Sequence, residues 1–412
     1  MTEGAILLLA PDRSYRTAAY VHAATSLDIP LVVAAWGAAD LSLPGQGIRI
    51  DASSDESALK TIREVASHRR FIAALPTDDS TVALSQKAAE MLDLPANAPE
   101  AVAASTNKLI FRELCRDAGV ATPSFQRVQI NDTSKWLGCD VGFPCVVKPM
   151  SLSASRGVIR CDDLNEVRAA LARIYALLSE EESSIEKACI IEDFIPGREF
   201  AIEALVCAGE LDVLAIFEKP DPLDGPFFEE TIYITPPRLE PIVIEDMTRQ
   251  LESICRAIGL LEGPIHAEVR VNEKGVWFLE LASRTIGGRC GRVVEYQTGY
   301  PLEQLVLLNA CRGQRQPGRR SGASGVMMIP VRERGVLRRV EGINRARSIP
   351  GVIDVEVDVR EGHLMRPWPE GSAYPGFIFA GGATSEFVEG ALRDAEAELR
   401  FIVAPEFNVK TD

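Results

Sequence analysis

The first hundred residues alternate short apolar runs with amphipathic segments, and this alternation constrains the fold more than any other feature of the sequence. Three apolar runs suit strands that are buried on both faces of a sheet: Ala5–Ala10, Leu31–Trp36 and Phe71–Pro76. Helical patterns lie between them, around residues 14–27 and 55–68. Strands that alternate with helices predict a Rossmann-like parallel sheet. The turn after the first run lacks GxGxxG, so the dinucleotide fingerprint is absent.

From about residue 143 the pattern changes to antiparallel strands. We predict strands near 143–148, 157–160, 188–195, 199–207 and 211–218, with helices near 105–119, 163–179 and 243–258. A Gly/Arg/Ser-rich stretch at 313–325 precedes further strands at 326–331, 352–359 and 376–380 and a helix near 384–401. The expected fold class combines α/β and α+β parts. We predict domains at 1–100, 101–315 and 320–412.

Composition excludes several classes of protein. The 412 residues carry a formal net charge of −15, which argues against a nucleic-acid surface but not against a nucleotide site. The nine cysteines are scattered without a CxxC pair, which favours a reducing compartment over a disulfide framework. No apolar run approaches the ~18 residues of a membrane helix, and no basic region precedes the first run. We therefore expect a cytoplasmic protein with no membrane contact and no nucleic-acid partner.

The segment from Lys148 to Val158 has the pattern of a phosphate-binding loop. A strand ends on Lys148, and Ser151, Ser153, Ser155 and Gly157 follow before the next strand begins. Small residues let backbone N–H groups approach phosphate oxygens, and a lysine at the strand end supplies a positive charge. An ordinary polar hairpin loop has the same pattern. The segment is neither a Walker loop nor a kinase loop.

The segment 263–280 predicts a hairpin that carries two glutamates on one face. Three-residue hairpin loops usually end in a left-handed glycine, so we take Glu273–Gly275 as the loop. This loop pairs Asn272 with Val276, and counting back two residues at a time places Glu268 opposite Glu280.

Two facing carboxylates repel unless a cation lies between them or one is protonated. Trp277, Leu279 and Leu281 are expected on the opposite face of the strand, against a core. These apolar flanks favour a Mg²⁺ site over the alternative of a solvated surface pair.

Arg284 follows Glu280 on the same face of the predicted strand. Its guanidinium can bind a carboxylate or a transferred phosphoryl group bidentately, and Gly287 and Gly288 open space beside it. A structural salt bridge is the other interpretation of such an arginine.

The segment from Glu192 to Glu203 contains an apolar strand end, an acidic pair and a tight turn. This pattern suits a strand edge that binds an adenine through its backbone, with Glu199 placed to accept hydrogen bonds from ribose hydroxyls. A solvated turn fits the same pattern.

Taken in order, these segments resemble the ATP-grasp superfamily from about residue 100 to 310. Lys219–Glu230, His266–Arg270 and Arg284–Gly288 are most similar to the carboxylate–amine ligases of the L-amino-acid ligase branch. The resemblance implies an ATP-grasp architecture: an N-terminal Rossmann-like parallel sheet, a lid at about 122–192, a central domain and a small C-terminal α+β domain.

The resemblance also implies a role for each candidate position. Lys108 and Lys148 correspond to the lysines that contact the phosphates, and the lid loop over the phosphates corresponds to Ser151, Ser153, Ser155 and Gly157. The strand that meets the adenine corresponds to Glu192, Asp193, Phe194 and Ile195, and the residue that binds the ribose corresponds to Glu199. Glu268 and Glu280 correspond to metal ligands, and Arg284 corresponds to the residue that binds the acyl-phosphate. The substrate candidates are Glu229, Glu230, His266, Arg284, Gly287 and Gly288.

Ala282 departs from the family pattern, which often has an asparagine there as a further metal ligand. The number of metal ions is therefore left open. The expected reaction uses ATP and Mg²⁺, with Mn²⁺ as an alternative, to activate a small carboxylate as an acyl-phosphate and couple it to an amine. The resemblance is also compatible with a homodimer. Two alternatives are a carboxylating or carbamoyl-phosphate-like enzyme and a non-catalytic nucleotide sensor, which Ala282 favours.

Overall fold

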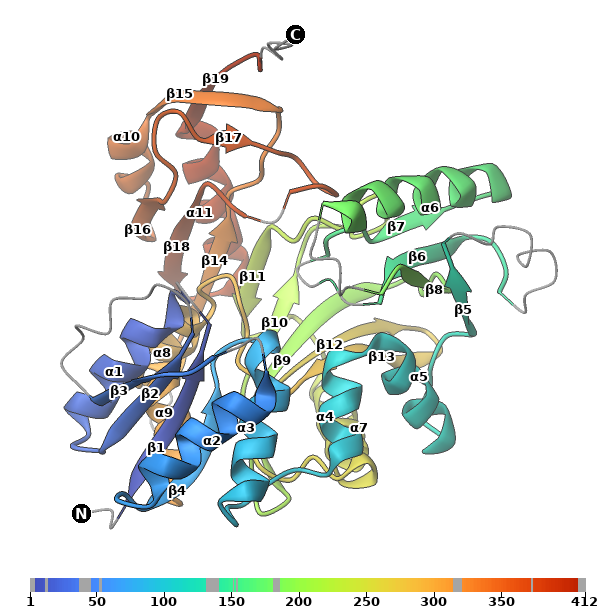
Figure 1. Ribbon diagram of the computed structural model, residues 1–412. Helices are drawn as coiled ribbons and strands as arrows, with labels where there is room; N and C mark the ends of the chain where they lie inside the picture. The colour runs from blue at the N-terminus through green and yellow to red at the C-terminus, as the bar shows by residue number, and fades with distance from the viewer. Residues whose placement is uncertain are drawn as a thin grey trace, which may run out of the picture.

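The computed structural model of the chain is built from four β-sheets with helices packed around them (Figure 1). The N-terminal part, drawn in blue, lies beside the central strands, the green lid stands on the other side of those strands, and the orange and red C-terminal part lies at the top of the view. The structure describes residues 4–11, 14–36, 46–51, 54–130, 141–150, 152, 155–180, 186–313, 321–371 and 373–406.

The N-terminal sheet is parallel, as the alternating pattern predicts. Its strand order is β3 (Gln46–Arg49), β2 (Leu31–Ala35), β1 (Ala5–Ala10) and β4 (Phe71–Pro76). The helices of this part are α1 (Arg16–Ser26), α2 (Asp55–Ala66) and α3 (Asp79–Met91). Strand β1 is buried along its whole length, and its side chains alternate between two separate apolar clusters. This two-sided burial explains why the strand reads as one apolar run.

The lid is a four-stranded antiparallel sheet in the order β5 (Phe125–Gln129), β8 (Ala188–Asp193), β6 (Cys145–Pro149) and β7 (Ile159–Cys161). Helix α6 (Leu164–Ser179) covers one face, and Asp163 caps it by accepting hydrogen bonds from the backbone N–H groups of Asn165 and Glu166. Apolar residues of the helix and of β6, β7 and β8 form one small core. The lid therefore has its own core, separate from the central sheet.

The central sheet has eight strands that pair antiparallel throughout. Their order is β13 (Gly275–Ala282), β12 (Gly263–Asn272), β9 (Arg198–Cys207), β10 (Glu210–Lys219), β11 (Ile232–Thr235), β14 (Ala323–Met328), β18 (Gly376–Gly382) and β16 (Val352–Val357). The pairing of β11 with β14 carries the sheet across the expected boundary near residues 315–320. The domain limits proposed from the sequence thus separate segments that share one sheet.

Helices pack on this central sheet and on its extension. Near β12 and β13 lie α4 (Pro99–Thr106), α5 (Lys108–Asp117) and α7 (Pro241–Ile258), while α8 (Gly291–Thr298) and α9 (Leu302–Ala310) fill the space toward the N-terminal sheet. The side chain of Asn107 caps α5, because its Oδ1 accepts from the N–H groups of Leu109 and Ile110. The helix predicted near 105–119 thus corresponds to α5, and Asn107 separates it from α4, which was not predicted.

The C-terminal part contains more structure than the apolar runs indicate. Beyond β14, β16 and β18 it holds a three-stranded sheet, in the order β17 (Leu364–Met365), β15 (Gly335–Glu341) and β19 (Arg400–Ala404). Its helices are α10 (Ile343–Arg347) and α11 (Ser385–Glu398). Strand β15 is interrupted by Arg338 and Arg339, and β17 has only two residues, so neither forms the apolar run by which a strand is found in a sequence. No helix in the described ranges is long and apolar enough to span a bilayer.

Candidate active site

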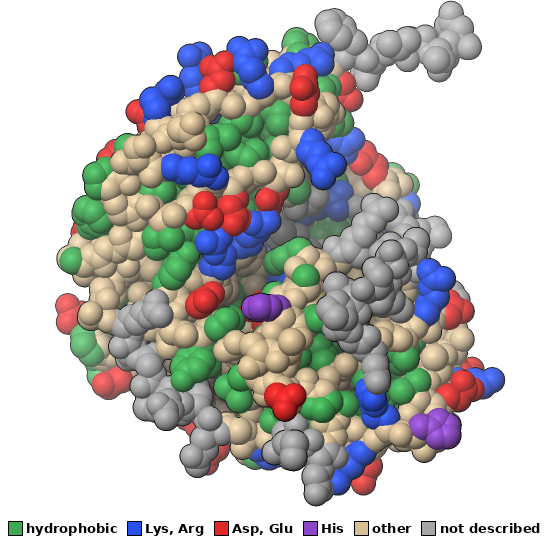
Figure 2. Space-filling view, turned by 90° about the vertical axis from the view of Figure 1, so that its left-hand side faces the viewer, with side chains coloured by type: hydrophobic (Ala, Val, Ile, Leu, Met, Phe, Trp, Pro, Cys, Tyr) green, Lys and Arg blue, Asp and Glu red, His purple; other side chains and the backbone are tan. Residues whose placement is uncertain are grey.

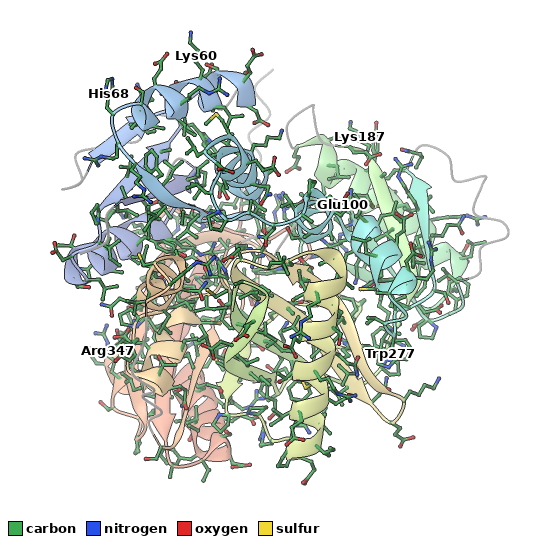
Figure 3. The ribbon with its side chains drawn as sticks, turned by 90° about the horizontal axis from the view of Figure 1, so that it is seen from below. Lys60, His68, Glu100, Lys187, Trp277 and Arg347 are labelled. Atoms are coloured by element: carbon green, nitrogen blue, oxygen red, sulfur yellow. The ribbon has the colours of Figure 1, made fainter. Side chains whose placement is uncertain are left out.

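A cavity of about 1330 Å³ lies where the N-terminal part, the lid, the central sheet and the C-terminal part meet. Figure 2 shows a hollow on one face, with acidic and basic side chains gathered on its rim. The view from below places the labelled residues of the surrounding parts well apart: Lys60 and His68 on the N-terminal part, Lys187 on the lid, Trp277 on the β12–β13 hairpin and Arg347 on the C-terminal part (Figure 3). Because residues from all four parts line the cavity, a ligand bound there would contact several parts of the chain at once.

Most of the candidate residues found in the sequence line this one cavity. They are Lys108, Lys148, Ser155, Glu192, Asp193, Phe194, Ile195, Glu199, Glu230, His266, Glu268, Glu280, Arg284, Gly287 and Gly288. Gly157 and Glu229 are not among the lining residues, and the Glu229 carboxylate accepts a hydrogen bond from the backbone N–H of Val331 at 3.2 Å. Ser151 and Ser153 lie outside the described residues.

The β12–β13 hairpin places Glu268 opposite Glu280, but its loop differs from the expected one. Asn272 pairs with Gly275 and Val271 with Val276, so the loop has two residues rather than three. A bulge near the middle of β13 then inserts one additional residue, Leu279, opposite the partner strand. The shorter loop and the bulge shift the register in opposite directions, and the two glutamates meet as predicted.

The bulge also changes which side chains enter the core. Val276 and Phe278 are buried in the cluster that includes α7 and β12, whereas Trp277 and Leu279 are only partly buried. Leu279 lines the cavity instead. The expectation that Trp277 and Leu279 face a core is therefore wrong, and only Leu281 fulfils it. An unbroken alternation cannot reveal a bulge, because the bulge itself reverses the two faces.

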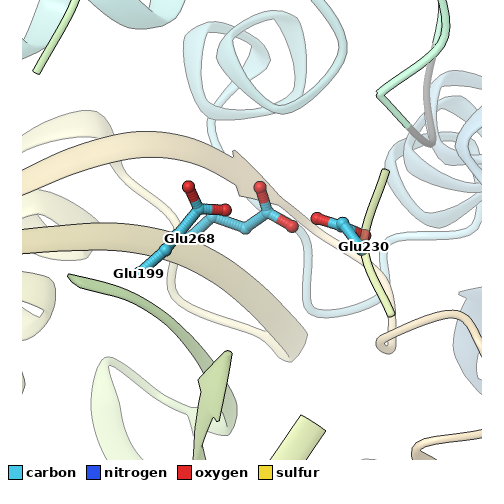
Figure 4. A group of neighbouring side chains, drawn as sticks. All are labelled: Glu199, Glu230 and Glu268. Atoms are coloured by element: carbon cyan, nitrogen blue, oxygen red, sulfur yellow. The ribbon is translucent and has the colours of Figure 1, made fainter. Parts of the chain in front are cut away.

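Three carboxylates surround one buried ammonium group in the cavity wall. The Nζ atom of Lys219 lies 2.9 Å from Oε1 of Glu199, 2.5 Å from Oε1 of Glu230 and 3.1 Å from Oε1 of Glu268. Figure 4 shows the three glutamate side chains pointing toward a common centre. The three glutamates were candidates from the sequence pattern, whereas Lys219, the positive charge that lies between them, was not.

The electrostatics of this cluster follow from its burial. Burial disfavours the charged ammonium, but three neighbouring carboxylates outweigh this effect and raise the pKa of Lys219. Burial and the charge of Glu268 raise the pKa of Glu230 to about 7, although Lys219 acts in the opposite direction. Lys219 therefore stays charged, and Glu230 is the carboxyl of the cluster that takes up a proton most readily.

The cluster has the donor chemistry of a divalent-cation site. One oxygen each from Glu199, Glu230 and Glu268 lies within 4.8 Å of the others, and Glu280 stands opposite Glu268 in the strand register. Carboxylate oxygens at this spacing suit Mg²⁺ or Mn²⁺. The Lys219 ammonium lies at the centre of the three carboxylates, so these carboxylates already stabilise one positive charge.

Lys148 and Lys108 both face the space where β6 and α5 approach the lid loop. The Lys148 ammonium binds the carboxylate of Glu192, and burial lowers its pKa despite that partner. Glu192 also accepts two hydrogen bonds from Arg112, which is 2% exposed, at 2.9 Å from Nε and 3.2 Å from Nη2. The Lys108 ammonium donates to the carbonyl oxygen of Leu152 at 2.8 Å. The Glu192 carboxylate therefore holds Lys148 in position, and it is not available at a strand edge to meet the adenine.

The strand edge expected to meet an adenine is held by Arg270. Its Nη1 donates to the carbonyl oxygen of Ile195 at 2.7 Å, and its Nε donates to Oε2 of Glu199 at 2.8 Å. Its guanidinium carbon also lies 5.0 Å from the centre of the Phe194 ring. Both oxygens of Glu199 therefore have protein partners, one from Lys219 and one from Arg270.

Arg284 is bound by the N-terminal part of the chain. Its Nε lies 2.8 Å from Oδ1 of Asp79 and its Nη2 lies 3.1 Å from Oδ2 of the same residue. Asp79 is the first residue of α3, directly beyond the carboxyl end of β4, where ligands bind in open parallel sheets. Nothing in the local sequence pattern distinguishes Asp79 from an ordinary helix-start acid, which is why it was missed.

His266 lies between two carboxylates. Its Nδ1 is 3.6 Å from Oε2 of the fully buried Glu203 and its Nε2 is 3.5 Å from Oε1 of Glu268. Burial lowers the pKa of the imidazole, but the two carboxylates outweigh burial and raise it. Glu203 accepts a hydrogen bond from the backbone N–H of Ile286 at 3.0 Å and so ties this strand to the segment after Arg284.

The 219–230 segment docks on the lid. The backbone N–H of Arg160 donates to the carbonyl oxygen of Pro226 at 2.9 Å, and its Nη1 donates to that of Asp224 at 2.8 Å. Just before β7, the N–H of Gly157 donates to the carbonyl oxygen of Pro369 in the C-terminal part at 3.2 Å. Glu230 at the end of the segment therefore reaches the carboxylate cluster while the middle of the segment contacts the lid.

Comparisons with known proteins agree with this architecture. The model of the ATP-grasp domain matches residues 141–293, and that of the L-amino acid ligase C-terminal domain 2 matches residues 327–404. Dapdiamide A synthase of Enterobacter agglomerans is 26% identical over 355 residues, which span 82% of this chain and 79% of that protein. Alanine–anticapsin ligase of Bacillus subtilis is 23% identical over 277 residues, 63% of this chain and 58% of that ligase.

A solved structure extends the likeness over the whole chain. The L-amino acid ligase from Bacillus licheniformis has a TM-score of 0.84 and 27% sequence identity, with 98% of this chain and all of that chain covered. The chain is a member of the ATP-grasp superfamily. The match to its C-terminal residues places it in the L-amino acid ligase-like branch, among the ATP-dependent carboxylate–amine ligases.

Proposed function

We propose that this ligase activates an amino acid or a related small acid as an acyl-phosphate in the large cavity and couples it to an amine. The observation that carries the proposal is that one cavity unites two lysines, a glutamate cluster and a fixed arginine. These are the groups needed to hold polyphosphate, a divalent cation and a reacting carboxylate in one place.

The two lysines would bind the phosphates of ATP. Lys108 begins α5 and Lys148 is held by Glu192, so both approach the lid loop from rigid elements. Positive charges at fixed positions stabilise the charge that develops when the γ-phosphoryl group moves to a carboxylate. Asp193, Phe194 and Ile195 would line the adenine position beside the Arg270 guanidinium. The N–H groups of Asp193 and Phe194 already donate to the carbonyl oxygens of Ser124 and Pro144, so the adenine would use the backbone groups that remain.

Glu268 and Glu280 would hold Mg²⁺, with Glu230 and Glu199 nearby to adjust the charge of the site. Bound there, the ion would neutralise phosphate oxygens and orient them for transfer. The Lys219 ammonium keeps the glutamates from separating by mutual repulsion before the ion arrives. Glu268 is thereby preorganised on β12.

Arg284 would bind the reacting carboxylate and then the acyl-phosphate through the N–H groups that remain on its guanidinium, since Nε and Nη2 bind Asp79 and Nη1 donates to the carbonyl oxygen of Thr285 at 3.2 Å. Glu230 would accept the ammonium group of a substrate, because its carboxylate stands in the cavity wall at the end of the lid-docked segment. The amino group that attacks the acyl carbon must be neutral, so it releases a proton before or during the attack. Gly287 would leave room for the substrate beside Arg284, whereas a Cβ atom on Gly288 would lie 2.4 Å from Sδ of Met328, so Gly288 would act by allowing the chain to pack there.

The lid and the 219–230 segment would exclude water from the acyl-phosphate. Arg160 holds the lid to the 219–230 segment through Asp224 and Pro226, and Gly157 holds it to the C-terminal part through Pro369. An acyl-phosphate reacts with water unless the site is closed, so these contacts favour transfer to an amine over hydrolysis.

The test is ADP release with MgATP, screened over single amino acids and other carboxylic acids and then over pairs with amines. Glu280→Ala is the site variant, and Glu273→Ala at the exposed hairpin loop is its matched control. We expect ADP release that requires an acid and an amine together, with loss of turnover only in Glu280→Ala. Tight ATP binding without stimulated turnover across the screen would instead support a nucleotide sensor. Light scattering on the same samples tests the expected homodimer.

A further inference from the structure

Glu203 is a buried carboxylate that the proposed reaction does not use. It lies on β9 between Ala201 and Leu205, on the face of the strand that packs into an apolar cluster with Ile286. Its side chain is fully buried, and within the described part of the chain its Oε1 atom has no hydrogen-bond partner. A carboxylate in such surroundings lowers the stability of a fold, so packing does not explain why a glutamate stands there.

The other oxygen of Glu203 holds the chain just beyond Arg284. Its Oε2 atom accepts a hydrogen bond from the backbone N–H of Ile286 at 3.0 Å. Residues 284–287 belong to neither a helix nor a strand, because β13 ends at Ala282 and α8 begins at Gly291. The path of this segment therefore depends on contacts with distant side chains rather than on a regular hydrogen-bond ladder.

Arg16 holds the same segment from the N-terminal part of the chain. It is 7% exposed, and its Nη2 donates to the carbonyl oxygens of Thr285 at 3.4 Å and Ile286 at 3.2 Å. Its Nη1 donates to the carbonyl oxygen of Thr77 at 2.5 Å and to Oδ1 of Asp78 at 3.0 Å. The N–H of Ile286 is thus bound from β9 and its carbonyl from α1, in both cases by a charged side chain, which makes the stronger kind of hydrogen bond.

These contacts fix the backbone that carries Arg284. The carbonyl oxygen of Thr285 accepts from Nη1 of Arg284 at 3.2 Å as well as from Arg16. A shift of Thr285 and Ile286 would therefore move the Arg284 guanidinium, although Asp79 binds its other edge. Displacements of about 1 Å at a group that orients a reacting centre can cost roughly a hundredfold in rate.

We infer that Glu203 is a positioning residue of the acyl-transfer site, which together with Arg16 fixes the backbone of residues 284–287 and thereby the place of the Arg284 guanidinium. The inference rests on the proposed function, since it assigns a role in that reaction to a group that touches no substrate. The other neighbour of Glu203 is His266, whose Nδ1 lies 3.6 Å from Oε2, too far for a hydrogen bond. The contact with Ile286 is therefore the one that carries the role.

The first test compares Glu203→Met with Glu218→Met, which removes a second buried carboxylate of the same sheet. Glu218 on β10 is 3% exposed, binds Arg198 and Arg238, and does not line the cavity. We expect Tm to fall further in Glu218→Met, because two arginines lose their counter-charge. We expect kcat to fall roughly tenfold to a hundredfold in Glu203→Met alone, with KM for ATP unchanged in both variants. Glu203→Gln keeps an acceptor oxygen for the N–H of Ile286 and should recover part of kcat.

The second test is a double-mutant cycle of Glu203→Met and Arg284→Gln. If Glu203 acts through Arg284, its replacement should lower kcat little further once Arg284 has been replaced. Losses that multiply in the double variant would overturn the inference, as would a wild-type kcat in Glu203→Met. A higher Mg²⁺ requirement in Glu203→Met would also overturn it, because Glu203 would then act through His266 on the metal ligand Glu268.

If no pair of substrates supports turnover, the proposed function fails and the positioning role is read without turnover. The probe is then inorganic phosphate, titrated calorimetrically into the complex of the protein with MgADP. Arg284→Gln and Glu203→Met should both weaken the binding of phosphate, whereas Glu218→Met should leave it unchanged, and none of the three should alter the affinity for MgADP. A wild-type affinity for phosphate in Glu203→Met would show that Arg284 keeps its place without Glu203.

Discussion

Arg284, in the segment after β13, and Asp79, the first residue of α3, form a bidentate ion pair with N···O distances of 2.8 and 3.1 Å. Burial raises the pKa of Asp79, but the adjacent Arg284 outweighs burial and holds it below its usual value. The pair joins the N-terminal parallel sheet to the residue that we expect to bind the acyl-phosphate. The N-terminal part therefore contributes directly to the geometry of the cavity, although it supplies none of the predicted ATP or metal ligands.

Replacing Asp79 by asparagine should lower kcat far more than it changes KM for ATP. Asp79 acts as a positioning residue, since its carboxylate fixes the plane of the Arg284 guanidinium. Loss of that orientation should reduce kcat by roughly tenfold to a hundredfold, because small misplacements of a positioning group have effects of this size. Steady-state ADP release measures both constants.

The exposed Asp93, just beyond α3, provides the matched control through Asp93→Asn, which should leave both constants unchanged. Asp79→Glu should restore part of kcat if the carboxylate is what matters. A wild-type kcat in Asp79→Asn would show that Arg284 keeps its position without Asp79.

Replacing Lys219 by methionine should make the stability of the protein depend on divalent cations. The substitution leaves the carboxylates of Glu199, Glu230 and Glu268 without their shared ammonium group. Breaking a buried ion pair costs about 3–5 kcal/mol, so Tm should fall clearly in the presence of EDTA. Mg²⁺ should then bind the uncompensated carboxylates and recover several degrees by mass action. Thermal unfolding with EDTA and with Mg²⁺ measures both effects.

Lys87→Met is the control, because Lys87 is a half-exposed partner of Asp55 at the protein surface. Its Tm should change little and should not respond to Mg²⁺ more than wild type does. A Tm of Lys219→Met that is the same with EDTA and with Mg²⁺ would mean that the three glutamates do not form a cation site.

The sequence was sufficient to predict the parallel N-terminal sheet, the antiparallel strands that follow it and most of the candidate residues that the cavity brings together. The apolar runs of β1, β2 and β4 are continuous because both faces of that sheet are covered, and this leaves a clear pattern. Glu268, Glu280 and Arg284 were found because strand periodicity alone places them on a common side. The two-residue loop and the bulge at Leu279 were not predictable, since each shifts the register by one residue and the two shifts cancel at Glu268.

The residues that were missed act through partners distant in the chain. Lys219 ends β10 and meets carboxylates from β9, β12 and the segment before β11, while Arg112 reaches Glu192 from α5. A lone lysine or arginine in a helix or strand carries no local signal of such a role. Arg112 occupies an ordinary position in an amphipathic helix pattern, and only its 2% exposure shows that it is part of the interior.

Glu192 should make a measurable contribution to stability that disappears in acid. Burial raises its pKa, but Arg112 and Lys148 together lower it to about 2. An unfolded glutamate titrates near 4.3, so this contribution is complete above about pH 5 and is lost as the pH falls toward 2. The shift corresponds to a contribution on the order of 3 kcal/mol. Urea unfolding of Glu192→Gln between pH 6 and pH 3 should show a weaker dependence on pH than wild type, from a lower starting value.

The lower starting value arises because the amide leaves the buried Arg112 and Lys148 without a counter-charge. Asp55→Asn removes an exposed ion pair with Lys87 and should change the unfolding free energy by less than about 1 kcal/mol at any pH in this range. Parallel pH profiles for wild type and Glu192→Gln would contradict the prediction, because they would assign the acid sensitivity to other carboxylates.

Gly225 should control how well the 219–230 segment closes over the cavity. Its φ is +93°, and a Cβ atom at this position would lie 2.7 Å from the Cβ of Arg160 on the lid. Gly225→Ala should therefore separate the segment from β7 and admit water to the acyl-phosphate, so that ADP forms without coupled product.

Gly209→Ala is the control, since Gly209 has a similar φ of +81° in the β9–β10 turn, and a Cβ atom there would meet only the side chain of Leu261, at 3.4 Å. Both variants should lose ~1 kcal/mol or more of stability from backbone strain, but only Gly225→Ala should raise the ratio of ADP to ligated product. An unchanged ratio in Gly225→Ala would mean that water is excluded by the rest of the lid without this segment.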